Sequence, residues 1–112
     1  MKLRERGVNQ NIGITAAAVR VPVRNCHSVQ IVADFEKPFS TKEVEEIMKN
    51  AKGVIVKEPF PMPIHVNNKD EVFVGRIRKV EGGESTLSLF CVADNVRKGA
   101  ATNAIQILKL LV

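Results

Sequence analysis

Hydrophobic residues alternate with polar ones in four stretches of the chain, and this is the period of a β-strand with one buried face. We predict strands over 14–23 and 29–35, where apolar residues recur at every second position. Two further strands are expected over 70–80 and 85–93. The segment between these last two, Glu81–Glu84, contains two glycines, so the pair is predicted to form a β-hairpin.

Two other stretches carry the apolar spacing of an amphipathic helix. The first begins after Ser40, whose hydroxyl can cap the helix together with Glu43, and it ends at Gly53. The second is expected over 95–111, with Asp94 as its N-cap. The end of this second helix is apolar nearly all round, so we expect another surface to cover it.

The middle of the chain is predicted to be less regular. Residues 54–56 predict a short strand. A loop is expected over 59–68, because its three prolines cannot donate hydrogen bonds to a sheet. The fold class that follows is α+β, a mostly antiparallel sheet with two helices on one face or at one end. A length of 112 residues predicts a single domain, 1–112.

Composition removes several classes of partner. The formal net charge is +5, but the basic residues are scattered and there is no Trp or Tyr, so we expect no nucleic-acid partner. No apolar run is long enough to span a bilayer, so we expect no membrane insertion. Two cysteines are too few for a disulfide framework and predict a reduced, cytoplasmic location. The His and Cys spacings predict no metal site.

The stretch VRVPVRNCHS at 19–28 holds the residues that could carry chemistry. Arg20 could bind a carboxylate through two parallel hydrogen bonds, and His27 belongs to the residue type that titrates near neutral pH. From the residues alone, an exposed strand cation and a surface turn residue are the commoner interpretations. Cys26 precedes His27, but neighbouring residues of an extended segment point to opposite faces, so we expect no shared pocket. Cys91 is expected to be a small buried hydrophobe.

Three stretches together resemble the C-terminal part of the aspartate-β-semialdehyde dehydrogenase family. They are VRVPVRNCHS at 19–28, DEVFVGRIR at 70–78 and VADNVRKGAATNAIQI at 92–107. Three motifs in this order are far more specific than any one of them. The resemblance implies the C-terminal domain of the glyceraldehyde-3-phosphate dehydrogenase-like fold. It also implies an enzyme that reduces aspartyl phosphate to aspartate semialdehyde with NADPH, on the pathway to lysine, threonine and methionine.

The same resemblance implies roles for three residues. Arg20 would bind the substrate carboxylate, His27 would be the catalytic acid and base, and Asn95 would lie near the nicotinamide of the cofactor. For Asn95, helix-start chemistry is an equally good explanation. The family's nucleophile is a cysteine in an Asn-Cys motif that lies far upstream of these three stretches. The pair Asn25-Cys26 falls inside the first stretch, after Arg20, so it is not that motif, and Cys26 is not expected to replace the nucleophile.

The printed sequence also contains no glycine-rich phosphate loop, so we expect the nucleotide-binding domain to be absent from it. The chain alone is expected to be inactive and not to bind NADP tightly. The alternative function is a non-catalytic dimerisation or interaction module derived from this family. The expected partners are a second copy in a homodimer and a small-molecule substrate. A separate chain that carries a nucleotide-binding domain is a further candidate.

Overall fold

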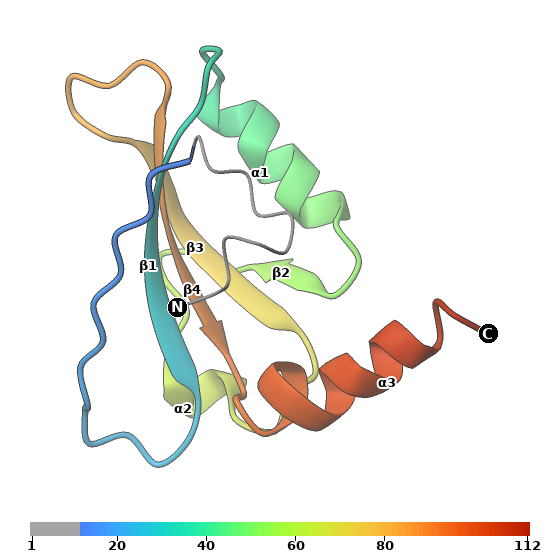
Figure 1. Cartoon of the computed structure of the whole chain (residues 1–112). Coiled ribbons are helices and arrows are strands. Elements are labelled where there is room, and N and C mark those ends of the chain that lie inside the picture. Colours follow the sequence, from blue (N-terminus) through green and yellow to red (C-terminus); the bar gives the residue numbers. More distant parts are fainter. Residues whose placement is uncertain (1–11) are drawn as a thin grey trace.

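A four-stranded sheet forms the centre of the computed structural model, which describes residues 12–112 (Figure 1). The strands lie in the order β1-β4-β3-β2. β4 pairs antiparallel with β1 and with β3, whereas β2 pairs parallel with β3. The strands are β1 (His27–Asp34), β2 (Val54–Val56), β3 (Val72–Lys79) and β4 (Thr86–Ala93). The predicted α+β class, the mostly antiparallel sheet and the hairpin of β3 and β4 are confirmed.

Helix α1 (Thr41–Asn50) lies against one face of the sheet, over β2 and β3 (Figure 1). It begins as predicted, because the Ser40 hydroxyl accepts a hydrogen bond from the Glu43 N–H at 3.1 Å. Ala51 is its C-cap, and Gly53 follows with a φ of +78°, a backbone conformation that favours glycine. The main core lies beneath this helix, where Val44 and Met48 pack against the buried residues Val74, Ile77, Leu87 and Leu89.

The last helical segment begins with an irregular turn. Its first part, η2 (Arg97–Ala101), has π-helical hydrogen bonding, and α3 (Thr102–Leu108) continues as an α-helix. The segment begins at Arg97 with Val96 at the N-cap, two residues later than predicted, so Asp94 is not the N-cap. Asp94 still bonds to this first turn, because one of its carboxylate oxygens accepts hydrogen bonds from the N–H groups of Val96 and Arg97 at 2.9 and 3.1 Å. The helix ends at Leu108, three residues earlier than predicted, and α3 projects away from the sheet (Figure 1).

Two predicted elements are wrong. Residues 13–23 have no regular secondary structure and pair with no strand among the described residues. Their alternating side chains are exposed, because a strand needs a neighbouring edge to accept and donate its backbone hydrogen bonds. The predicted loop at 59–68 contains a short helix, α2 (Pro63–Val66). Pro63 is its first residue, a position where the missing N–H costs no helical hydrogen bond.

The face of the sheet beneath α1 is only half covered. Val29 lies opposite Cys91 and Ile31 opposite Leu89 in the pairing of β1 with β4, so these residues share the face on which Leu89 packs in the core. Because α1 lies over β2 and β3, Val29 and Ile31 remain 49% and 39% exposed. This half of the face, next to β1, is open to another surface.

The opposite face carries a smaller core at one end. Its buried residues are Cys26, Val66 and Val92, and Phe73 and Phe90 pack against them. Val66 belongs to α2, so α2 covers this end of the face. No helix between residues 12 and 112 combines the length and the apolar character needed to cross a membrane. Residues 1–11, which the predicted domain includes, lie outside the described part of the chain.

Candidate functional site

His27 is the first residue of β1 and lies opposite Ala93 in β4. Side chains alternate along a strand, so His27 lies on the same face as Val29, the half-covered face of the sheet. Its side chain is exposed. Access to solvent and to a ligand is what an acid and base catalyst requires.

Cys26 lies on the other side of the backbone from His27. Its side chain is buried against Val66 and Val92, and its thiol donates a hydrogen bond to the Pro63 carbonyl at 3.6 Å. Burial, and secondarily the nearby carboxylate of Asp94, raise the pKa of the Cys26 thiol, so the reactive thiolate is disfavoured. The two side chains therefore share no pocket, as expected. The backbone at Cys26, however, is left-handed, with a φ of 81°, rather than extended.

Asn95 contacts the segment that leads into β1. Its side-chain oxygen accepts a hydrogen bond from the Cys26 N–H at 2.9 Å. This contact joins two residues that are 69 positions apart in the sequence. It brings Asn95 and His27 to the same end of the sheet. Whether Asn95 also contacts a cofactor stays a prediction.

Asp94 anchors the helix that follows and the loop after α2. Its second carboxylate oxygen accepts a hydrogen bond from the Asn68 N–H at 2.8 Å, and the residue is only 1% exposed. This hydrogen bond is the main reason that the pKa of Asp94 lies below its usual value, and the N–H groups of Arg97 and Val96 lower it further. A side-chain hydrogen bond of 3.0 Å between Asn25 and Asn67 completes the contacts. We call the set Asn25, Cys26, Asn67, Asn68, Asp94 and Asn95 the polar junction.

Sequence reasoning missed most of the polar junction. The sequence indicates only a turn at Asn25 and only a loop at Asn67 and Asn68. The available signal was the density of asparagine and aspartate near predicted turns, because their side chains readily bond to backbone N–H groups. Which of these residues meet each other depends on the tertiary fold.

Arg20 is exposed and lies within residues 13–23, which run outside β1 (Figure 1). Among the described residues, its guanidinium forms no ion pair. The roles that the resemblance implies for Arg20 and His27 require the two side chains to converge on one concave site. Neither residue lines the hollow of about 630 Å³ or the hollow of about 330 Å³ found in the part of the chain that the structure describes. Their convergence stays a prediction.

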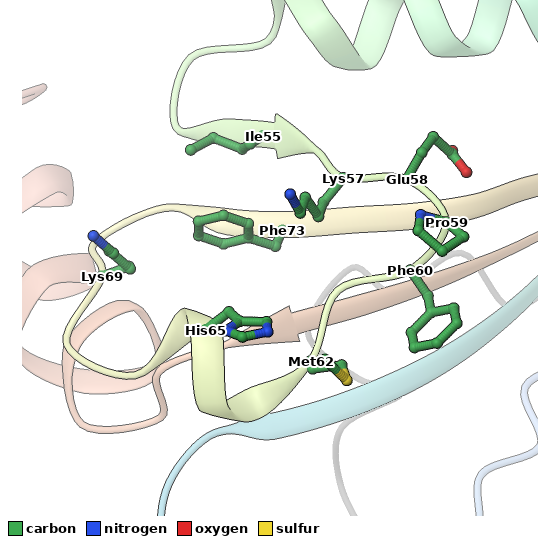
Figure 2. A pocket seen from close by; sticks show the side chains of 9 residues that line it. All are labelled: Ile55, Lys57, Glu58, Pro59, Phe60, Met62, His65, Lys69 and Phe73. Carbon is green, nitrogen blue, oxygen red and sulfur yellow. The ribbon is translucent and has the colours of Figure 1, made fainter.

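The larger hollow lies on the opposite face from His27 and has a volume of about 630 Å³. Figure 2 shows Lys57, His65 and Lys69 around the ring of Phe73, whereas Glu58 points away from it. The basic groups come from the end of β2, from α2 and from the loop after it, so their proximity is a product of the fold. No group of three or more metal-binding side chains occurs in the region 12–112.

Comparison with known proteins decides the family. A family described as "Semialdehyde dehydrogenase, dimerisation domain" matches residues 3–98. The chain belongs to this family. The matched region includes Arg20, His27 and Asn95. The resemblance inferred from the three motifs is therefore confirmed.

The relatives of this dimerisation domain are aspartate-semialdehyde dehydrogenases. The protein of Aquifex aeolicus is 51% identical over 109 residues, which cover 93% of this chain and 32% of the relative. The protein of Prochlorococcus marinus is 46% identical over 110 residues, with the same two coverages. The chain thus spans about a third of the length of these curated relatives.

A solved structure supports the fold. The crystal structure of aspartate semialdehyde dehydrogenase II from Vibrio cholerae, complexed with ASA, aligns with a TM-score of 0.77 and 38% identity. The alignment covers 82% of this chain and 28% of that one. The arrangement of the sheet and helices is therefore that of a portion of these enzymes.

Proposed function

We propose that this chain is the dimerisation and substrate-binding portion of an aspartate-semialdehyde dehydrogenase. The complete enzyme would reduce aspartyl phosphate to aspartate semialdehyde with NADPH and release phosphate, in the biosynthesis of lysine, threonine and methionine. The observation that carries the proposal is the family match over residues 3–98, which spans all three candidate site residues. The cytoplasmic location remains a prediction.

His27 is the proposed acid and base. Its exposed imidazole lies at the end of β1 on the half-covered face, where another part of the enzyme can present the reacting groups. In this role it accepts the proton of the nucleophilic thiol and returns a proton to the leaving group. The thiol would come from another part of the complete enzyme, because Cys26 is buried on the other face and burial raises the pKa of the Cys91 thiol, which disfavours its thiolate.

Arg20 is the proposed ligand of the substrate carboxylate. A guanidinium can donate two parallel hydrogen bonds to a carboxylate, which fixes the orientation of the substrate as well as its charge. Residues 13–23 carry the alternation of a strand but have no strand partner among the described residues. We propose that the rest of the enzyme packs against this segment and brings Arg20 towards His27.

Asn95 is the proposed contact of the nicotinamide ring. Its oxygen accepts the Cys26 N–H, so its amide nitrogen is the group left to donate a hydrogen bond to a carboxamide oxygen. This hydrogen bond would hold only the nicotinamide end of NADPH, because the printed sequence has no loop that could bind the phosphates. When bound in the complete enzyme, NADPH supplies the hydride. We propose that the chain alone does not bind it tightly.

Association is part of the proposal. Ile105, Ile107 and Leu108 of α3 are 52–57% exposed, and Val29 and Ile31 are open on the half-covered face. Exposed apolar surface of this kind usually marks an interface. We therefore propose a twofold homodimer, consistent with the dimerisation-domain family. Light scattering at micromolar concentration should give twice the mass of one chain, and a monomer mass would contradict this part of the proposal.

The proposed function is tested with a chimaera. The nucleotide-binding portion of the Aquifex aeolicus relative is joined to this chain, and NADPH oxidation is followed with aspartyl phosphate as substrate. We expect activity from the chimaera and none from the chain alone. His27→Gln and Arg20→Ala should each reduce the rate at least about a hundredfold, the first mainly in kcat and the second mainly in KM.

His65→Gln is the matched control, because His65 is the other histidine and lines the hollow on the opposite face. It should keep activity within about twofold of the chimaera. A chimaera that folds as a dimer but shows no activity would favour the alternative, a non-catalytic dimerisation module. Activity of the isolated chain that is lost in Cys26→Ser would show that the nucleophile has been assigned wrongly.

A further inference from the structure

The backbone of Cys26 adopts a conformation that needs external support. Its φ of 81° lies in the left-handed region, where Cβ of a residue other than glycine approaches the backbone too closely. Such a residue persists only where surrounding contacts hold it. Cys26 immediately precedes His27, so its conformation sets the direction in which the chain runs into β1.

Two long-range contacts hold Cys26. The Cys26 N–H donates to the side-chain oxygen of Asn95 at 2.9 Å, and the thiol donates to the Pro63 carbonyl at 3.6 Å. Because only an acceptor can face an N–H group, the contact also determines which way the Asn95 amide is turned. The contact with Asn95 acts on the backbone itself, one residue before His27.

Asn95 is in turn held by its neighbour. Asp94 is buried and accepts hydrogen bonds from Asn68, Val96 and Arg97, which belong to two separate segments of the chain. The backbone at Asn95 is therefore held in place independently of the contact with Cys26. A mobile backbone at this position would support the strained residue less well, because ordering it would cost conformational entropy.

We propose that Asn95 is a positioning residue, which holds Cys26 in its left-handed conformation and thereby fixes where His27 lies. Its catalytic meaning rests on the role of His27 in the proposed function. The positioning itself is a property of this chain and needs no substrate or cofactor. This role is distinct from the predicted contact of Asn95 with the nicotinamide.

The test uses nuclear magnetic resonance on the isotopically labelled 112-residue chain. Two quantities are measured, the exchange protection of the amide at position 26 and the relaxation of the His27 ring signals. Asn95→Ala removes the acceptor, so protection should fall at least about tenfold and the His27 ring should become more mobile. Asn95→Asp keeps an acceptor oxygen and should retain both signals within about twofold of the wild type.

Substitutions at position 26 make the test specific. Glycine adopts the left-handed conformation without support, whereas alanine does not, and both remove the thiol. In the Asn95→Ala background, Cys26→Gly should therefore restore the order of the His27 ring, and Cys26→Ala should not. Both substitutions also leave a cavity where the thiol was, and disorder caused by that cavity would affect the two double variants equally.

Two results would overturn the proposal. The first is that Asn95→Ala changes neither the exchange protection of the amide at position 26 nor the relaxation of the His27 ring signals. The second is that, in the Asn95→Ala background, Cys26→Gly and Cys26→Ala give equally ordered His27 rings. If Asn95→Ala alone does not fold, the two double variants still decide. Folding with glycine but not with alanine supports the proposal, and unfolding of both refutes it. A failure of the proposed function would appear separately, as an inactive His27-containing chimaera with normal resonance signals.

Discussion

Gly75 lies where β3 meets the backbone of residues 57–61, and the space around it excludes a methyl group. A Cβ atom at this position would lie 2.5 Å from the Lys57 carbonyl oxygen and 2.8 Å from Cδ of Pro61. Both neighbours are held in place. The Lys57 N–H donates to the Val74 carbonyl at 2.8 Å, and Pro61 is buried. No flexible side chain can rotate away to make room.

We expect Gly75→Ala to lower the free energy of unfolding by about 2–3 kcal/mol, the upper part of the range for overpacked sites. The Lys57 oxygen would have to retreat from 2.5 Å to an ordinary contact distance of 3.4 Å. Such a movement displaces the backbone that leads from β2 into the hollow. The loss of stability should therefore exceed the loss caused by adding a methyl group next to a side chain that can move away.

Urea unfolding followed by circular dichroism measures this loss. With a urea dependence of about 1–3 kcal/mol/M, a loss of about 2–3 kcal/mol should lower the midpoint by roughly 0.7–3 M. Gly99→Ala is the matched control, because beyond the chain neighbours and the backbone of its own helix the nearest heavy atom to an added Cβ, which is Cβ of Asn95, would lie 3.8 Å away. Alanine in this helical segment should raise the stability by up to about 1 kcal/mol. A Gly75→Ala midpoint equal to that of the wild type would refute the reasoning.

Three further predictions concern the core, a helix cap and the effect of acid. Leu89→Ala, at a position only 4% exposed, should lower the free energy of unfolding by about 2–5 kcal/mol in the same urea assay, whereas Leu110→Ala, at 85% exposure, should change it by less than about 0.5 kcal/mol. Ser40→Ala should cost about 1 kcal/mol and Ser40→Asp much less, because only alanine removes the oxygen that accepts the N-terminal N–H; thermal unfolding can rank the two. The pKa of Asp94 is lower in the folded chain than in the unfolded chain, so its contribution to stability is present above the unfolded pKa and is lost as the pH falls through the folded pKa. Urea midpoints measured from neutral pH down into the acid range should thus fall less steeply in Asp94→Asn than in the wild type, and parallel curves would contradict the assignment of this acid dependence to Asp94.

The elements that the sequence predicted well are those whose signals lie within a few residues. The Ser40 cap and the stripe of α1 can be read from the sequence because a helix satisfies its own backbone hydrogen bonds. The hairpin of β3 and β4 is likewise local, since its two strands are joined by a short turn. The contact of Asp94 with the start of the last helical segment was also accessible to sequence reasoning, because the N–H groups that it binds lie only two and three residues later.

Residues 14–23 show where such reasoning stops. Their alternation of apolar and polar residues is real, but a strand exists only where another strand offers its edge. Among the described residues, no edge pairs with this segment. A pattern along the chain reports which side chains prefer burial, and it contains no information on whether a partner edge is present.

The candidate site divides in the same way. The sequence motifs predicted Arg20, His27 and Asn95 as candidate site residues, and the motif that contains Asn95 also predicted the start of a helix. Only the folded chain placed the Asn95 oxygen on the N–H of Cys26, 69 positions away, and only there did Cys26 become left-handed. Glycine is the usual sequence signal for that conformation, and a cysteine gives none. Long-range contacts of this kind depend on how β1, α2 and the last helix meet at one end of the sheet, and that meeting is determined by packing rather than by any local pattern.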